Sequence, residues 1–206
     1  MLSGNFWKRP VIAWATRVLA FAAVCLVPGF ALAQNRTSAG AMSQDAGSHQ
    51  DWRVRLNQQL QLMGHRNWIA VVDSAYPLQT SAGIETIETN DDQLAVVETV
   101  LGEMAKAKHV RPVIFADAEL KMVPESDAKG VTAYREALSS LLAMSEVQSL
   151  PHEEIIAKLD EAGKTFHILI LKTNLTIPYT SVFIRLECGY WGADAEKRLR
   201  AAMVAH

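Results

Sequence analysis

The run Trp68-Ile69-Ala70-Val71-Val72-Asp73 decides the fold class of this chain. Five apolar residues without a break, closed by a carboxylate, are typical of a strand that is buried on both faces of a sheet. The run Arg111-Pro112-Val113-Ile114-Phe115-Ala116-Asp117 repeats this pattern, and residues 166–171 and 181–186 are two further candidate strands. We therefore expect at least four strands, in a sheet with both faces covered.

Segments with helical spacing alternate with these runs. Apolar residues between Val54 and Met63 recur roughly at helical spacing and stop at Gly64, which predicts a helix over residues 51–63. Similar patterns predict four more helices, over residues 90–108, 132–144, 152–162 and 193–203. Because strands alternate with helices, the expected fold class is α/β, a three-layer α/β/α arrangement with a mostly parallel or mixed central sheet.

The N-terminal region has the features of a secretion signal. Basic residues precede an apolar run over residues 18–33, which ends in Ala31-Leu32-Ala33, the small residues that signal peptidase requires. Arg17 on one side and Pro28-Gly29 on the other leave this run short of the roughly 20 apolar residues that a membrane span needs. We predict an exported protein, periplasmic in location, with no membrane segment after the signal is cleaved.

The predicted domain organisation follows from this. Residues 1–33 form the signal peptide, residues 34–50 form a flexible linker of Ser, Ala, Gly, Asn and Gln, and residues 51–206 form a single α/β domain. Cys188 is then the one cysteine outside the signal peptide, so no intramolecular disulfide is expected and a small buried side chain is the simplest interpretation. A formal net charge of -2 provides no overall field for nucleic acid.

Polar residues gather where the predicted strands begin and end. In open α/β sheets, ligands bind beyond the carboxyl ends of the strands. Asp73 and the loop over residues 74–77 occupy such a place, Gly64-His65 precedes the same strand, Pro151-His152 begins a helix and Pro178-Tyr179 precedes the last strand. Each has an ordinary structural explanation when taken alone, as a turn former, a capping residue or a packed ring. Asp117, Glu119 and Lys121 are expected to form a solvated loop after a strand.

The order of these residues resembles the D-ribose pyranase and L-fucose mutarotase family. Gly64-His65 followed by residues 68–77 resembles that family's Gly-His, apolar strand and Asp-Ala-x-x-Pro segment. His152-Glu153-Glu154 resembles its downstream His at a helix start. Lys172-Thr173 and Pro178-Tyr179 fall where its basic-Ser/Thr-Gly-Glu-x-x-Pro-Tyr-x-Asn loop would lie. The resemblance extends from about Leu56 to Gly189 and implies a fold of the same kind.

The chain also departs from the family pattern. Asn174-Leu175 stands in place of Gly-Glu, Ser181 in place of the Asn that contacts sugar, and Asn67 in place of an Asp beside Gly-His. Ser74 replaces the usual Ala, and the spacing to Pro77 is one residue shorter. Family members of known activity are cytoplasmic. Retained acid/base groups beside an altered loop suggest a changed substrate or a lost activity.

The resemblance implies a sugar mutarotase or pyranase that acts on a free monosaccharide. Interconverting ring forms requires a proton removed from the anomeric hydroxyl and a proton delivered to the ring oxygen, and histidine suits both steps. We assign His65 as the acid/base group and Asp73 as acceptor of a sugar hydroxyl or partner that fixes a histidine tautomer. No cofactor is required.

The resemblance also implies a homo-oligomer. A neighbouring subunit is expected to contribute His152, which calls for a ring-shaped assembly, with a decamer as one candidate. Tyr179, Ser181 and Lys172 are the expected sugar-binding residues.

Two other classes of function remain open. The replaced Asn and Glu favour a non-catalytic monosaccharide-binding or transport-accessory protein of the periplasm. His65, Asp73 and His152 also have the ligand types that suit zinc, although no His-x-x-x-His or cysteine pair gives local support.

Overall fold

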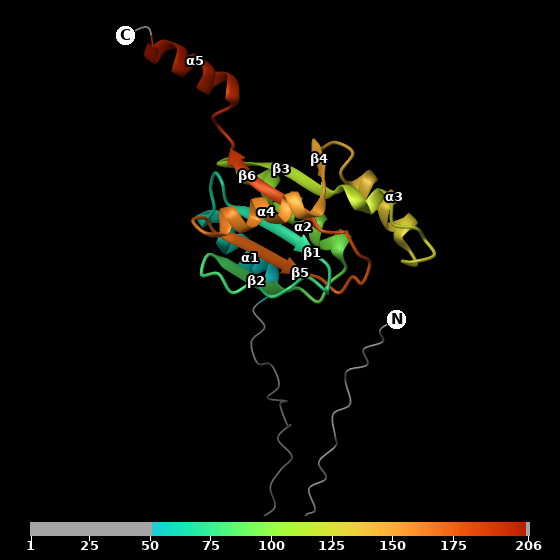
Figure 1. Ribbon diagram of the computed structural model, residues 1–206. Helices are drawn as coiled ribbons and strands as arrows, with labels where there is room; N and C mark the ends of the chain where they lie inside the picture. Colours follow the sequence, from blue (N-terminus) through green and yellow to red (C-terminus); the bar gives the residue numbers. More distant parts are fainter. Residues whose placement is uncertain (1–50, 205–206) are drawn as a thin grey trace, which may run out of the picture. The chain divides into compact units, whose positions relative to one another are not determined.

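The computed structural model of the protein describes residues 51–204 (Figure 1). The predicted signal peptide and linker lie outside these residues. Within the described part of the chain, no helix is both long and apolar enough to span a membrane.

A six-stranded mixed sheet forms the middle layer, in the spatial order β2-β5-β1-β6-β3-β4. Its strands are β1 (Trp68–Val72), β2 (Ile84–Glu88), β3 (Val110–Asp117), β4 (Val147–Leu150), β5 (Ile168–Lys172) and β6 (Val182–Cys188). β6 runs antiparallel to both of its neighbours, β1 and β3, and every other pairing is parallel. The expectation of a mixed central sheet is therefore confirmed.

Helices cover both faces of this sheet, which confirms the three-layer α/β/α fold. The helices are α1 (Trp52–Leu62), α2 (Gln93–Lys106), the short 3-10 helix η1 (Ala118–Lys121), α3 (Val131–Leu141), α4 (His152–Gly163) and α5 (Ala193–Val204). One core joins α1, α2 and α3 to one face of the sheet, and a second core joins α4 to the other face (Figure 1). α5 contains no buried residue.

β1 shows why an unbroken apolar run predicts this architecture. Successive side chains of a strand point to opposite faces. Ile69 and Val71 accordingly enter the core beneath α1 and α2, whereas Trp68, Ala70 and Val72 enter the core beneath α4. Burying a side chain such as Ile or Val stabilises the fold by about 1.5–3 kcal/mol. A polar residue anywhere in this strand would therefore lose that stabilisation on one face or the other.

Two strands lie beyond the four that the apolar runs indicate. β2 and β4 form the two edges of the sheet, and their side chains are largely exposed or half-buried. Both strands contain polar residues, because at the edge of the sheet their side chains are less deeply covered than those of the central strands. Their sequences are Ile84-Glu85-Thr86-Ile87-Glu88 and Val147-Gln148-Ser149-Leu150. Cys188, at the end of β6, is half-buried rather than fully buried.

Candidate functional site

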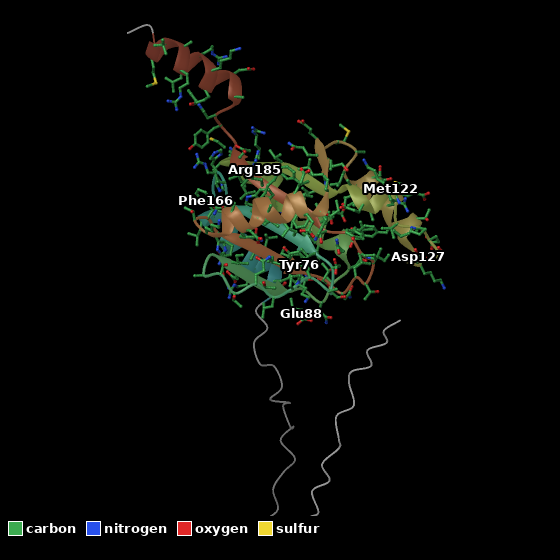
Figure 2. The ribbon with its side chains drawn as sticks, viewed as in Figure 1. Tyr76, Glu88, Met122, Asp127, Phe166 and Arg185 are labelled. Atoms are coloured by element: carbon green, nitrogen blue, oxygen red, sulfur yellow. The ribbon has the colours of Figure 1, made fainter. Side chains whose placement is uncertain are left out.

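A cavity of about 540 Å³ lies where β1 ends and α4 begins. Asp73, His152 and Tyr179 line it, together with the loop over residues 74–77 and the segment 176–178 that precedes β6. Figure 2 shows Tyr76, another lining residue, near the ends of β1 and β5. Three of the six candidate residues, from distant parts of the sequence, thus border one cavity in a single chain.

Asp73 shapes the loop that forms one wall of the cavity. Its Oδ1 accepts a hydrogen bond of 2.8 Å from the backbone N–H of Ala75, and its carbonyl oxygen accepts a longer one, of 3.3 Å, from the N–H of Tyr76. These bonds turn the chain directly after β1. Asp73 is therefore the turn former that its position suggests, and it also lines the cavity.

His152 is the first residue of α4 and is held by three separate contacts. Its Nδ1 lies 3.1 Å from Oδ1 of Asp117, the last residue of β3. Its backbone N–H donates to both carboxylate oxygens of Glu119, each at 3.0 Å. Its ring meets that of Tyr179 edge to face, with the centroids 5.7 Å apart. His152 thus lies beside Tyr179 of its own chain, so no neighbouring subunit is needed to bring these two residues together.

The expectation of a solvated loop at Asp117 and Glu119 is wrong. Asp117 is only 2% exposed, and the imidazole of His152 lies against its carboxylate. Burial raises the pKa of the Asp117 carboxyl above its ordinary range, His152 opposes that shift, and the nearby carboxylates of Glu119 and Asp73 add to it. Lys121 alone of the three is exposed.

Asp117 is the residue of the site that sequence reasoning missed, although a signal was present. It closes the second apolar run in the same way that Asp73 closes the first. Because β1 and β3 run in the same direction, both carboxylates lie at the same end of the sheet, where these strands finish.

Two tyrosines give the cavity different surfaces. Tyr76 is buried, and burial together with the charges of Asp160, Asp117 and Asp73 raises the pKa of its hydroxyl to about 12. Its phenol therefore keeps its proton at neutral pH while accepting a 3.2 Å hydrogen bond from Nε2 of Gln79. Tyr179 is 41% exposed and adopts a left-handed backbone conformation, with φ of 58°. Such a conformation is uncommon for a residue with a bulky side chain.

Lys172 makes a hydrogen bond within the protein, and Ser181 is buried. The Nζ of Lys172 donates a 2.8 Å hydrogen bond to the backbone carbonyl of Tyr76, so this side chain fastens the loop over residues 74–77. Ser181 is 2% exposed and lies directly before β6. Neither side chain lines the cavity.

His65 lies at the opposite end of β1. Its Nδ1 is 2.9 Å from Oε2 of Glu187, and the other oxygen of Glu187 is 2.9 Å from Arg185. Figure 2 marks this end of the sheet by Arg185, whose register partner is Trp68 at the start of β1. Five residues of strand span about 17 Å. In one chain, therefore, His65 does not share a cavity with Asp73 and His152.

No metal-binding set is assembled among residues 51–204. No three His, Cys, Asp or Glu side chains of this part of the chain are grouped so that they could hold a metal ion. The trio of His65, Asp73 and His152 is divided between the two ends of β1.

No protein-family model matches the chain, and no curated protein does. Solved structures to which it is similar include RbsD of Bacillus subtilis complexed with D-ribose, at 18% identity over 65% of this chain and 91% of that one, with a TM-score of 0.47. The fucose mutarotase of Streptococcus pneumoniae in complex with L-fucose is 15% identical over 68% of this chain and 97% of its own, with a TM-score of 0.42. FucU of Bifidobacterium longum is 11% identical over 65% of this chain and 94% of its own, with a TM-score of 0.44.

Proposed function

We propose that this domain binds a free monosaccharide in the cavity of Asp73, His152 and Tyr179 and interconverts its ring or anomeric forms by acid/base catalysis. It would then be a divergent member of the D-ribose pyranase and L-fucose mutarotase family. One observation carries the proposal: three residues singled out by the sequence motifs border a single cavity of about 540 Å³. Ligand pockets for small molecules commonly measure about 300–1,000 Å³.

The reaction needs few groups, and the cavity provides several of them. Opening the sugar ring breaks the bond between the anomeric carbon and the ring oxygen, while the anomeric hydroxyl loses a proton and the ring oxygen gains one. His152 takes the proton from the anomeric hydroxyl and returns it when the ring closes. Asp73 accepts a hydrogen bond from a sugar hydroxyl. Tyr76 remains a neutral phenol, and the exposed ring of Tyr179 provides an apolar surface for one face of the sugar.

The group that gives a proton to the ring oxygen would come from another copy of the chain. His65 is half exposed and has a carboxylate partner in Glu187, which fits an acid/base group, yet it lies at the far end of β1. We propose that, in a homo-oligomer, His65 of a second copy faces the cavity of the first. This keeps the expected assembly, with His65 rather than His152 as the histidine that crosses the interface.

Sugar exchange measured by NMR tests the proposal directly. Saturation transfer between anomers of ribose, fucose, galactose and glucose is recorded with the purified protein and with His152→Ala. We expect at least one sugar to exchange faster than in buffer, and the variant to lose about 10²- to 10⁴-fold of that rate, which is the usual contribution of positioned acid/base catalysis.

The control is Asp127→Ala, because Asp127 lies in an exposed loop and does not line the cavity. This variant should retain the exchange rate of the unmodified protein. An unmodified protein that exchanges no sugar faster than buffer would exclude the catalytic proposal.

A non-catalytic monosaccharide-binding protein is the second candidate. It is favoured by the separation of His65 from the cavity in one chain and by the burial of Ser181. Titration calorimetry distinguishes the two functions, since heat of binding without accelerated exchange would select this candidate.

A further inference from the structure

Asp117 is a buried carboxylate with no assigned task in the proposed reaction. Its side chain is fully covered, and neither of its oxygens accepts an aligned hydrogen bond from any of residues 51–204. Burying a carboxylate without such partners is costly. The simplest explanation for burying this carboxylate is its contact with the one basic group that it faces.

That basic group is the imidazole of His152. Its Nδ1 lies 3.1 Å from Oδ1 of Asp117, and this nitrogen is itself buried without another hydrogen-bond partner in the described part of the chain. The other charged groups near Asp117 are the carboxylates of Glu119 and Asp73, which oppose its negative charge. The pair of Asp117 and His152 is therefore an acid and a base that meet inside the protein.

The remaining part of the His152 ring reaches the cavity. The side chain is 29% exposed although its Nδ1 is covered, so the accessible part of the ring lies away from Asp117. His152 also lines the cavity of Asp73 and Tyr179. Nε2 is thus the nitrogen that remains for a ligand.

We propose that Asp117 is a positioning residue for His152: its carboxylate keeps the proton on Nδ1, so that Nε2 presents a free electron pair to the cavity. This assignment rests on the proposed function in that Nε2 would exchange the proton with the sugar. A carboxylate behind a catalytic imidazole is a recurrent way of fixing its tautomer. Asp73 is then left for a sugar hydroxyl, because only Oδ1 of its carboxylate is used in the turn after β1.

The backbone of the same residue is fixed as well. Glu119 accepts the N–H of His152 at 3.0 Å, and Tyr179 contacts the ring edge to face. These contacts limit rotation of α4 and of the imidazole, so that the contact with Asp117 determines which nitrogen carries the proton.

Long-range ¹H–¹⁵N correlation spectra of the full chain labelled in histidine test this assignment. At about pH 8, above the ordinary titration range of histidine, we expect His152 to carry its proton on Nδ1. His152→Gln identifies the signal. Asp117→Asn should move the proton to Nε2, because an amide can donate to Nδ1 where a carboxylate cannot. Asp73→Asn is the control and should leave the tautomer unchanged.

The assignment is overturned if His152 of the unmodified protein carries its proton on Nε2, or if Asp73→Asn rather than Asp117→Asn moves it. The first of these outcomes does not depend on Asp117→Asn, so it stands even if that variant does not fold. In the sugar-exchange experiment, Asp117→Asn should lower kcat by about 10²-fold or more and leave KM nearly unchanged. If the unmodified protein exchanges no sugar, the proposed function fails, whereas the tautomer measurement still decides the role of Asp117.

Discussion

At the scale of single residues, the candidate site depends on how a carboxylate is buried. Asp73 follows β1 and Asp117 ends β3, but Asp73 hydrogen-bonds to its own loop, whereas Asp117 is buried beside His152 at the start of α4. The same residue type thus has two environments at the end of the sheet where β1 and β3 finish. A carboxylate that borders the cavity can bind a ligand, whereas a buried one can position a neighbouring side chain.

Asp117 should make the stability of the protein depend on pH. Its pKa is raised in the folded state, so the protonated form favours folding, and this stabilisation is lost as pH rises from the ordinary aspartate range, near 4, through the raised value. We expect the free energy of unfolding of the unmodified protein to fall relative to that of Asp117→Asn over this interval. Urea unfolding at a series of pH values measures the difference.

Asp127→Asn is the matched control, since Asp127 lies in an exposed loop (Figure 2). A difference between Asp117→Asn and the unmodified protein that stays constant with pH would contradict the assigned cause.

At the scale of elements, α4 is the helix that carries the site, and its first turn is capped from outside. Pro151, which precedes the helix, provides no side-chain acceptor, and Glu119 of η1 takes that place. The negative charge of Glu119 also suits the positive end of a helix. Through this hydrogen bond, the 3-10 helix η1 connects the end of β3 to the start of α4.

Glu119→Ala should destabilise the fold by about 1 kcal/mol, the usual cost of losing a cap. Chemical denaturation measures this as a lower midpoint. Glu161→Ala, at the exposed end of the same helix, is the control and should change the midpoint less. Equal effects of the two substitutions would mean that Glu119 does not act as a cap.

Elements differ in how well the sequence predicts them. The sequence predicts the four inner strands, β1, β3, β5 and β6, because burial on two faces requires runs of apolar residues. The edge strands β2 and β4 contain polar residues, and their sequences resemble those of loops. The order of strands in the sheet has no local signal either, because pairing joins segments such as β1 and β5 that are far apart in sequence.

The candidate site shows the same limits. His65 and Asp73 bracket one predicted strand, and the length of that strand is enough to place them at opposite ends. The contact between His152 and Asp117 depends on the pairing of β3 with β4 and on the start of α4, which spacing along the chain does not reveal.

At the scale of the whole molecule, the proposed mechanism takes its two histidines from two copies of the chain, because His65 lies before β1 and the cavity lies after it. We predict that His65→Ala and His152→Ala each lower the rate of sugar exchange by about 10²- to 10⁴-fold, and that a randomly mixed oligomer of the two recovers roughly a quarter of the activity. That fraction is the share of interfaces at which His65 of one copy meets His152 of another. Exchange measured after co-expression checks it. Full activity of His65→Ala, or no recovery on mixing, would exclude a shared site.

We also propose that the mature protein is exported to the periplasm. Mass spectrometry of the protein recovered from a periplasmic fraction should give a chain that begins at Gln34, after cleavage behind Ala33. Replacing Leu19 and Val24 in the apolar run by arginine should retain the protein in the cytoplasm. An intact N-terminus in the native cell would contradict the signal peptide.

The place of β6 has a consequence for biosynthesis. This strand lies between β1 and β3, yet it is the last of the six to leave the ribosome. Until residue 188 has emerged, the nascent chain exposes two unsatisfied strand edges in what becomes the centre of the sheet, and such edges invite pairing with other chains. The sheet can therefore be completed only after β6 has emerged, and a truncation before residue 182 should yield insoluble polypeptide rather than a smaller functional unit.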